Sequence, residues 1–275
     1  LGIHAADVAD RSLHRLCDGL YQRVLQRAQP FVRTCGEVSA EFGVPILQRR
    51  VCVAPIDLLC DGHSPDDVVN LGRTLDGAAA HVHLDQIAGY LVRVQHGMST
   101  TSRQMIAALP AVLSQTERVQ AAVVAANSSS GVNLDAVELL GHKVKEAAEA
   151  TADRGGVGAA KLSILANLPA EGPPMSGVLS PEGWGDLTVH VSVSAMGSIR
   201  HTLEQRLAQD PHPSLTTLAG DIKAAAFQSA RVAELIGREI AFRMNASFGR
   251  VDVSLAPTIR QGQTTAIGGH QGHFV

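Results

Sequence analysis

Hydrophobic and polar residues alternate in short stretches along this chain, and longer segments with helical spacing separate those stretches. Alternation with a period of two predicts a strand, whereas apolar residues three and four positions apart predict a helix. The helical segment after Asn133, for example, carries an apolar stripe through Leu140 and Val144. The predicted strands span residues 46–53, 87–94, 119–126, 161–166, 188–194 and 250–255. Strands that alternate with helices predict an α/β fold with a mostly parallel sheet, either open or barrel-like.

Pro and Gly residues mark the limits of the helices expected between these strands. The first helical region covers residues 7–42, and Pro30 predicts a break that divides it into two helices. Ser64 followed by Pro65 is typical of a helix start, because Ser caps the helix and Pro is tolerated in its first turn. Later helices are expected at 101–114, 133–152, 198–208 and 218–243.

Three of the predicted strands carry a reactive polar side chain at alternate positions. These positions are Lys161, Ser163, His190, Ser192, Ser194, Asp252 and Ser254. Strands of a parallel sheet are usually covered on both faces and read as continuous Val, Ile and Leu runs. An unpaired polar group in a dry interior costs roughly 2–7 kcal/mol. We therefore expect these side chains to meet one another, water or a ligand, which indicates an active or binding site.

Polar residues also gather where the predicted strands end. In parallel α/β folds, sites collect at the carboxyl ends of the strands, where the loops converge. Those ends carry Gln95, His96, Asn127, Ser128, Asn167, Ser192, Ser194, Asp252 and Ser254. The group predicts a site that binds a polar small molecule and moves a proton. The alternative is that these are ordinary loop residues and helix caps whose polar groups are already satisfied.

Asp153 and Arg154 form a second candidate for substrate binding. Asp153 is expected at the end of a helix, where the dipole disfavours an anion, so Arg154 or the more distant Lys161 should compensate its charge. The alternative is a structural ion pair that ties the helix to the next loop. Lys161 begins a strand, and desolvation there would lower its pKa, so that a neutral amine could act as base or nucleophile. Lysines near strand starts are, however, more often solvated.

The composition argues against several classes of protein. The 275 residues are 45% hydrophobic but only 3% aromatic, so the core must be aliphatic. A net charge of −3 leaves no basic patch that would attract nucleic acid, and no apolar run approaches the ~20 residues that a membrane span needs. No secretory leader is visible. Cys17, Cys35, Cys52 and Cys60 form no Cys-x-x-Cys pair, which is typical of reduced thiols, and we expect a cytoplasmic protein.

No cofactor or metal ion is predicted. His81 and His83 with Asp85, and separately His270 with His273, resemble metal ligands in composition, but neither motif fixes a further ligand. The glycine-rich stretch 155–158 follows a helix and precedes a strand, which is the wrong order for a phosphate-binding turn.

Five segments together carry a family signature. They span residues 37–46, 133–141, 149–154, 231–239 and 248–258. In these segments the chain resembles an uncharacterised bacterial and archaeal family, domain of unknown function 711, whose members are often called PFL family proteins. The resemblance implies an α/β barrel related to the ten-stranded barrels of glycyl-radical enzymes and ribonucleotide reductases. It implies no particular activity or catalytic residue. Typical members are longer, with a further C-terminal segment.

The chain as a whole predicts one α/β domain over residues 1–275, barrel-like but incomplete, because six strands cannot close a ten-stranded barrel. An open sheet edge should be covered, so we expect a homo-oligomer or a partner subunit.

The leading hypothesis for function is an enzyme that acts on a small polar or carbonyl-containing metabolite by general acid–base chemistry. The alternatives are a non-catalytic small-molecule-binding or regulatory subunit, and a structural partner of another chain. The candidates for proton transfer are Asp252, His190 and Lys161. The candidates for substrate binding are Asn127, Ser128, Asn167, Ser194, Asp153 and Arg154.

Overall fold

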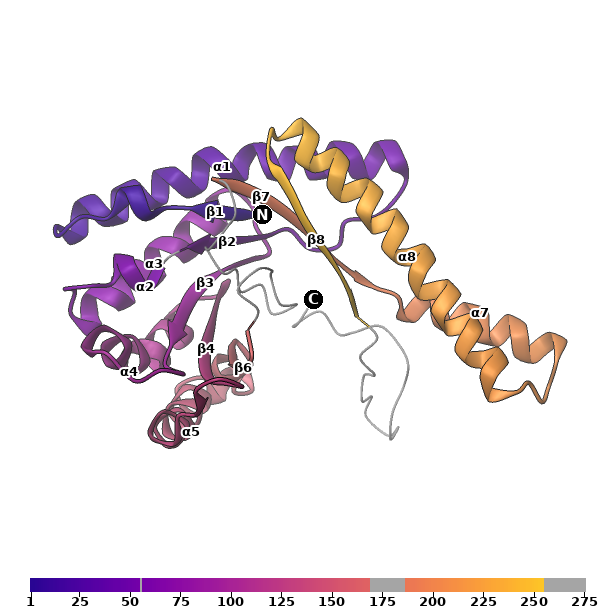
Figure 1. The fold of residues 1–275 in the computed structure, drawn as a ribbon. Helices are drawn as coiled ribbons and strands as arrows, with labels where there is room; N and C mark the ends of the chain where they lie inside the picture. Colours follow the sequence, from indigo (N-terminus) through magenta and orange to yellow (C-terminus); the bar gives the residue numbers. More distant parts are fainter. Residues whose placement is uncertain (55, 169–185, 255–275) are drawn as a thin grey trace.

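The computed structural model describes residues 1–54, 56–168 and 186–254. Strands in these ranges form one mixed sheet with helices around it (Figure 1). The strands are β1 (Gly2–His4), β2 (Arg50–Ala54), β3 (Gln86–Arg93), β4 (Val119–Asn127), β5 (Gly131–Val132), β6 (Leu162–Ala166), β7 (Leu187–Ser194) and β8 (Ser247–Ser254). The α-helices are α1 (Leu13–Phe42), α2 (Ile56–Leu59), α3 (Pro65–His81), α4 (Thr100–Gln115), α5 (Leu134–Glu149), α6 (Val157–Ala160), α7 (Met196–Gln209) and α8 (Leu215–Arg243). Two short 3₁₀ helices, η1 (Ala6–Val8) and η2 (Ala152–Arg154), complete the described elements.

The sheet is mostly parallel, as predicted, with one important change of direction. Its strand order is β5-β4-β3-β2-β1-β7-β8, and β6 also pairs with β4. Strands β1, β2, β3, β4 and β6 pair in parallel, and so do β7 and β8. Between the two groups, β1 pairs with β7 in antiparallel register, with Gly2 opposite Thr188. Strands β7 and β8 therefore run in the opposite direction to β2, β3 and β4.

The hydrogen-bonded path from strand to strand does not close into a barrel. Strands β6 and β8 each pair with one neighbour within the described ranges, and they form the two sides of the opening. Figure 1 shows the strands fanned from β6 to β8 in one curved sheet, with helices on its outer side. This arrangement confirms the predicted incomplete, barrel-like α/β fold.

Helix α1 corrects the prediction of a break at Pro30. It is a single helix from Leu13 to Phe42 with Pro30 inside it. The apolar stripe that begins with Leu20 and Val24 continues beyond the proline through Phe31 and Val38, all of which are buried. Burial of this continuous stripe against the sheet stabilises the helix on both sides of Pro30, so tertiary packing overrides the local preference of proline.

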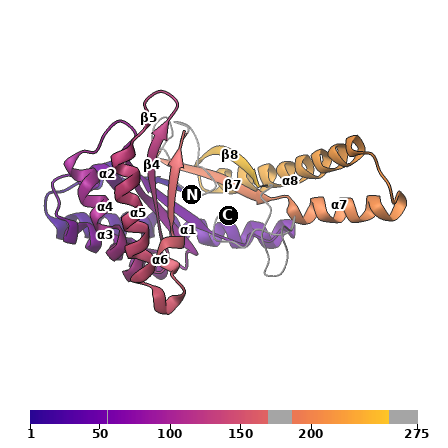
Figure 2. The same ribbon diagram turned by 90° about the horizontal axis from the view of Figure 1, so that it is seen from below.

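The two faces of the sheet differ in what covers them. Helices α3, α4 and α5 lie along one side, while the α7–α8 pair projects beyond the sheet (Figure 2). The main hydrophobic core lies between the helices and the outer face of the sheet; its strand residues include Ile3, Val53, Ile87, Val123 and Val189. On the opposite face, here called the inner face, the described residues form small apolar clusters such as Cys52 with Ala88. Of the helices described, none has an apolar stretch long enough to cross a membrane.

Candidate functional site

Strands β7 and β8 present their polar side chains on the inner face. Val189 on β7 belongs to the main core, and Val191 packs toward Gly237 of α8, so these positions face the helices. Because side chains alternate along a strand, His190, Ser192 and Ser194 face the other way. Asp252 lies beside them on β8, since it is the register partner of Ser192. The polar alternation of β7 and β8 therefore becomes one polar surface, to which the third strand, β6, does not contribute.

His190 is held in a defined, neutral state. Its Nδ1 atom accepts a hydrogen bond from the backbone N–H of Arg250 at 3.1 Å. Burial lowers the pKa of His190 to about 4, because the charged form is desolvated. The ring is therefore uncharged at neutral pH. With Nδ1 accepting, the remaining proton belongs on Nε2, so that atom is a hydrogen-bond donor on the inner face.

Asp252 and Ser194 supply the reactive oxygens of the same surface. The Oδ2 atom of Asp252 and the Oγ atom of Ser194 are buried, and neither has a hydrogen-bond partner among the residues that the structure describes. Burial raises the pKa of the Asp252 carboxyl above its usual value, and the positive charge of Arg250 opposes that shift. Buried polar groups normally find partners, so these two oxygens, with Thr188 Oγ1 further along the same face of β7, indicate a place for a ligand or water.

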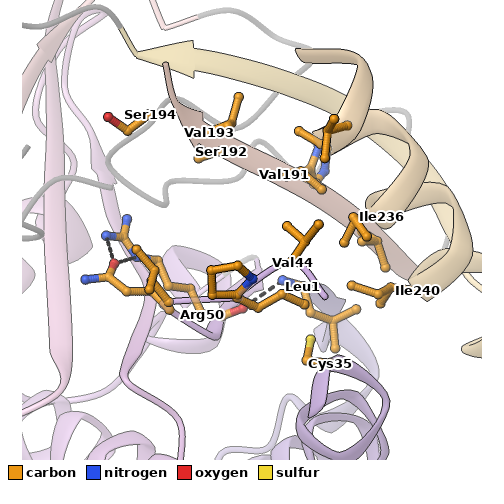
Figure 3. A pocket seen from close by; sticks show the side chains of 18 of the residues that line it. Leu1, Cys35, Val44, Arg50, Val191, Ser192, Val193, Ser194, Ile236 and Ile240 are labelled. Atoms are coloured by element: carbon orange, nitrogen blue, oxygen red, sulfur yellow. Dashed lines mark hydrogen bonds between the residues drawn. The ribbon is translucent and has the colours of Figure 1, made fainter. Parts of the chain in front are cut away.

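A cavity of about 760 Å³ lies beside this polar surface. It is bounded by β7, α8, α1 and the segment 44–52. Figure 3 shows Val191, Ile236 and Ile240 on one side of it and Arg50 on the other. Arg50 donates from Nε and Nη2 to Oε1 of Gln48 at 3.0 and 2.5 Å. Burial lowers the pKa of Arg50 to about 10, so its guanidinium stays charged at neutral pH.

The change of strand direction divides the predicted site residues into separate groups. Since β7 and β8 run against β2, β3 and β4, their carboxyl ends lie where those strands begin. Ser194 and Asp252 are therefore at the opposite end of the sheet from Asn127, Ser128 and Asn167. The expectation that all the strand ends meet at one edge is wrong for this reason.

The residues at the carboxyl ends of β4 and β6 form their own hydrogen-bonded cluster. The Oδ1 atom of Asn167 accepts from the backbone N and the Oγ of Ser128 at 2.6 and 2.8 Å. The Oδ1 atom of Asn127 accepts from the backbone N–H groups of Ser129 and Ser130 at 3.0 and 2.6 Å. These contacts fix the loop that follows β4. They favour the alternative that the polar groups of this loop are already satisfied.

A smaller polar cavity of about 400 Å³ lies next to this cluster. Gln95, His96 and Arg103 are among its lining residues. His96 lies near the cluster, with its Nε2 atom 3.5 Å from Nδ2 of Asn127. At the same end of the sheet, Arg93 of β3 donates to Asp57 at 2.8 Å.

Lys161 lies far along the sheet from His190 and Asp252. It precedes β6, and strands β4, β3, β2 and β1 stand between β6 and β7 in the sheet order. Its buried Nζ donates to the backbone oxygen of Thr116 at 2.5 Å and lies 3.4 Å from the hydroxyl of the same residue. Burial lowers the pKa of Lys161 to about 8. The amine thus holds the start of β6 against the end of α4.

Asp153 and Arg154 lie in η2, away from the surface formed by β7 and β8. Arg154 donates from Nη2 to the backbone oxygen of Ser114 in α4 at 2.6 Å. This contact ties the end of the α5 region to α4, but it is a hydrogen bond to a backbone oxygen and not the ion pair that the structural interpretation expected. Asp153 is exposed to solvent.

Sequence reasoning did not single out Arg50 and Gly249. Arg50 could have been found, because Gln48, Arg50 and Cys52 repeat the alternation of a polar strand face. Gly249 gave no signal, since its role depends on the ring of His190 on the neighbouring strand.

Two of the composition-based metal candidates, His81 and Asp85, have other contacts. His81 Nδ1 lies 2.9 Å from the hydroxyl of Tyr21, and Asp85 pairs with Arg49 at 3.3 Å. In the described part of the chain, no group of three His, Cys, Asp or Glu side chains is arranged to hold a metal ion. His270 and His273 lie outside the described residues.

Comparison with known proteins identifies the family. The model of the family described as Uncharacterised ACR (DUF711) matches residues 1–267. A UPF0210 protein of Desulforudis audaxviator is 39% identical over 97% of this chain, and one of Methanospirillum hungatei is 37% identical over 97%. The chain spans 58% of the length of each of these two relatives. It belongs to this uncharacterised protein family.

Proposed function

We propose that the inner face of β7 and β8 is the active surface of an enzyme that acts on a small polar or carbonyl-containing metabolite by general acid–base chemistry. One observation carries the proposal. Two buried oxygens, Asp252 Oδ2 and Ser194 Oγ, share this face and have no hydrogen-bond partner in the described part of the chain. A substrate that offers a donor to Asp252 and an acceptor to Ser194 would satisfy both.

The chemistry of the surface supports a division of roles. Asp252 is the proton-transfer group, because its raised pKa makes the carboxylate a stronger base than an exposed aspartate. The hydroxyl of Ser194 can donate to a carbonyl oxygen on which negative charge develops. His190, whose pKa burial lowers to about 4, is neutral at pH 7 and adds no charge to this surface.

Arg50 supports a substrate that carries an acidic group. Arg50 and Cys52 are two residues apart on β2, so their side chains lie on the same face of the sheet. Cys52 packs with Ala88 on the inner face, and Arg50 therefore lies on that face as well. A half-buried guanidinium on this face would attract a carboxylate or phosphate and hold it by charge-assisted hydrogen bonds. The favoured substrate class is therefore a small oxo acid or sugar phosphate.

Exchange of carbon-bound hydrogen in D₂O tests the proposal directly. The protein is incubated with a panel of pyruvate, 2-oxobutyrate, oxaloacetate and dihydroxyacetone phosphate, and deuterium incorporation next to the carbonyl is followed by NMR. The proposal predicts catalysed incorporation into at least one compound, and a loss of about 100-fold or more for Asp252→Asn. Asp66→Asn, an exposed carboxylate in the first turn of α3, is the matched control.

Two results would count against the proposal. Exchange that is catalysed equally by the wild type and Asp252→Asn would remove Asp252 from the mechanism. Binding of a panel compound without any exchange would favour the rival function, a non-catalytic small-molecule-binding or regulatory subunit.

A further inference from the structure

The smaller cavity, of about 400 Å³, lies where β3 and β4 end, and its volume is within the range of small-molecule sites. Its wall consists of the segments that lead from β3 into α4 and from β4 into α5, together with the first turns of the two helices. In parallel α/β sheets, ligands bind where such segments converge at the carboxyl ends of the strands. The cavity is therefore in a position where this kind of sheet binds ligands.

Hydrogen bonds hold the two walls of this cavity in place. Asn133, the N-cap of α5, donates from Nδ2 to the backbone oxygen of Val94, just after β3, at 2.7 Å. Its Oδ1 atom accepts from the backbone N–H of Ala136 at 3.1 Å. On the other wall, Gly97 has a φ of +125°, which residues with a side chain rarely adopt, and its N–H donates to the same oxygen of Val94 at 3.1 Å. Both walls are thus attached to one strand end, so the cavity is formed before a ligand arrives.

Gln95 contributes a buried oxygen to this cavity. Its Oε1 atom is shielded from solvent and has no hydrogen-bond partner among the residues that the structure describes. A buried acceptor without a partner is unfavourable, so a ligand that donates a hydrogen bond at this point would recover the loss. A carboxylate alone has no such donor. The oxygen therefore indicates a ligand with an N–H or O–H group.

Two side chains of opposite charge line the same cavity. Arg103 lies in the first turn of α4, and Asp135 lies in the first turn of α5, where the helix dipole favours a negative charge. Both are exposed, and neither side chain has an ion-pair or hydrogen-bond partner within residues 1–54, 56–168 and 186–254. With His96 uncharged, the lining has no net charge and offers a ligand one group of each sign.

We propose that this cavity binds a free α-amino acid as its zwitterion. The carboxylate of the ligand pairs with the guanidinium of Arg103, and its ammonium donates to Oε1 of Gln95 and to the carboxylate of Asp135. A zwitterion matches a lining with one charge of each sign, whereas a simple anion would be repelled by Asp135 and a simple cation by Arg103. Charge-assisted hydrogen bonds are stronger than neutral ones, so these three side chains suffice to orient a small ligand.

The cavity is separate from the proposed acid–base surface. Strands β7 and β8 run against β3 and β4, so Ser194 and Asp252 lie at the opposite end of the sheet. The amino acid is therefore not the substrate of that surface. Asp252→Asn should bind the amino acid as the wild type does, and the failure of either proposal leaves the other standing.

Titration of the ¹⁵N-labelled chain with the proteinogenic amino acids, followed by NMR, tests the proposal. Acetate and methylamine are the controls, because each offers only one of the two charged groups. At least one amino acid should bind ~10-fold or more tightly than either control, since only the zwitterion engages both charged side chains. The same amino acid should shift the side-chain amide signals of Gln95 and the backbone amide signal of Gly97.

Two substitutions test the roles of the charged side chains. Arg103→Gln and Asp135→Asn should each weaken binding of that amino acid by about 10-fold or more. Neither should lower the thermal midpoint appreciably, because neither side chain has a partner in the described part of the chain. The matched controls are Arg73→Gln and Asp66→Asn, which replace exposed residues of the same types on α3 and should bind as the wild type does.

Three results would overturn the proposal. The first is that no amino acid binds, and the second is that acetate or methylamine binds as tightly as the best amino acid. The third is binding that keeps its full strength in Arg103→Gln and Asp135→Asn, or that shifts no signal of Gln95 or Gly97, because the ligand would then lie elsewhere.

Discussion

The imidazole of His190 lies directly against Gly249 on the neighbouring strand. A Cβ atom at position 249 would come within 2.1 Å of Cε1 and 2.3 Å of Nδ1 of His190. Gly249→Ala must therefore push the ring away and break its hydrogen bond with the N–H of Arg250. We expect a loss of about 1–3 kcal/mol in the free energy of unfolding, the usual cost of overpacking, measured by urea denaturation.

Gly36→Ala is the matched control for this substitution. Gly36 lies inside α1, and nothing lies within 4 Å of the position that its Cβ would take. The alanine should stabilise the protein by about 0.5–1 kcal/mol, because glycine in a helix interior is unfavourable relative to alanine. If Gly249→Ala behaved like Gly36→Ala, the contact between His190 and Gly249 would not exist in solution.

Asp252→Asn should stabilise the folded protein at neutral pH. Since the pKa of Asp252 is raised on folding, its contribution to stability is fully present below its ordinary value of 3.8 and is lost as pH rises through the folded value. Asparagine does not ionise, so the variant escapes that loss. Urea denaturation at several pH values should show that the free energy of unfolding of the variant increases relative to that of the wild type between pH 3.5 and 7. A difference that does not change with pH would mean that Asp252 is not desolvated.

The contribution of Lys161 to the free energy of unfolding should rise with pH in the alkaline range, in contrast to that of Asp252. Its pKa falls from 10.5 to about 8 on folding, so between these values the unfolded chain binds more protons than the folded one. The stability of the wild type should therefore rise from pH 8 to pH 10 relative to Lys161→Met, by on the order of 2 kcal/mol. Parallel stability curves for the two proteins would show that the amine is not buried as described.

Asn127 is expected to stabilise the loop after β4 mainly through its amide oxygen. Its Oδ1 atom accepts from the backbone N–H groups of Ser129 and Ser130 and from the hydroxyl groups of the same two residues. Asn127→Ala should cost about 0.5–1.5 kcal/mol, because the exposed donors of the loop lose the acceptor that they share and turn to water instead. Asn127→Asp keeps the acceptor and should retain most of the stability. Equal losses for the two variants, measured by thermal unfolding, would contradict this role.

Sequence reasoning predicted the strands that are long enough to show a recognisable pattern of apolar and polar residues. Each of the six predicted segments contains most of an observed strand, from β2 to β8 without β5. Strands β1 and β5 were missed, because three and two residues are too short to show alternation. The family and the open, barrel-like sheet were also predicted correctly.

The direction of β7 is what the sequence could not provide. Local alternation shows that His190, Ser192, Ser194 and Asp252 share a face, and they do. It does not show which neighbour β7 pairs with, and that pairing with β1 decides at which end Ser194 lies. The predicted group therefore combined residues from opposite ends of the sheet. In the same way, the local pattern around Pro30 could not show that Phe31 and Val38 are buried in one continuous helix.

The most direct measurement for the central claim is an NMR titration of the Asp252 carboxyl in protein with ¹³C-labelled aspartate, assigned by comparison with Asp252→Asn. The account predicts a titration midpoint above the ordinary value of 3.8, and a change in that midpoint when an exchanging oxo acid is added. A midpoint at or below 3.8 that does not respond to any panel compound would contradict a desolvated, ligand-facing carboxyl on the inner face.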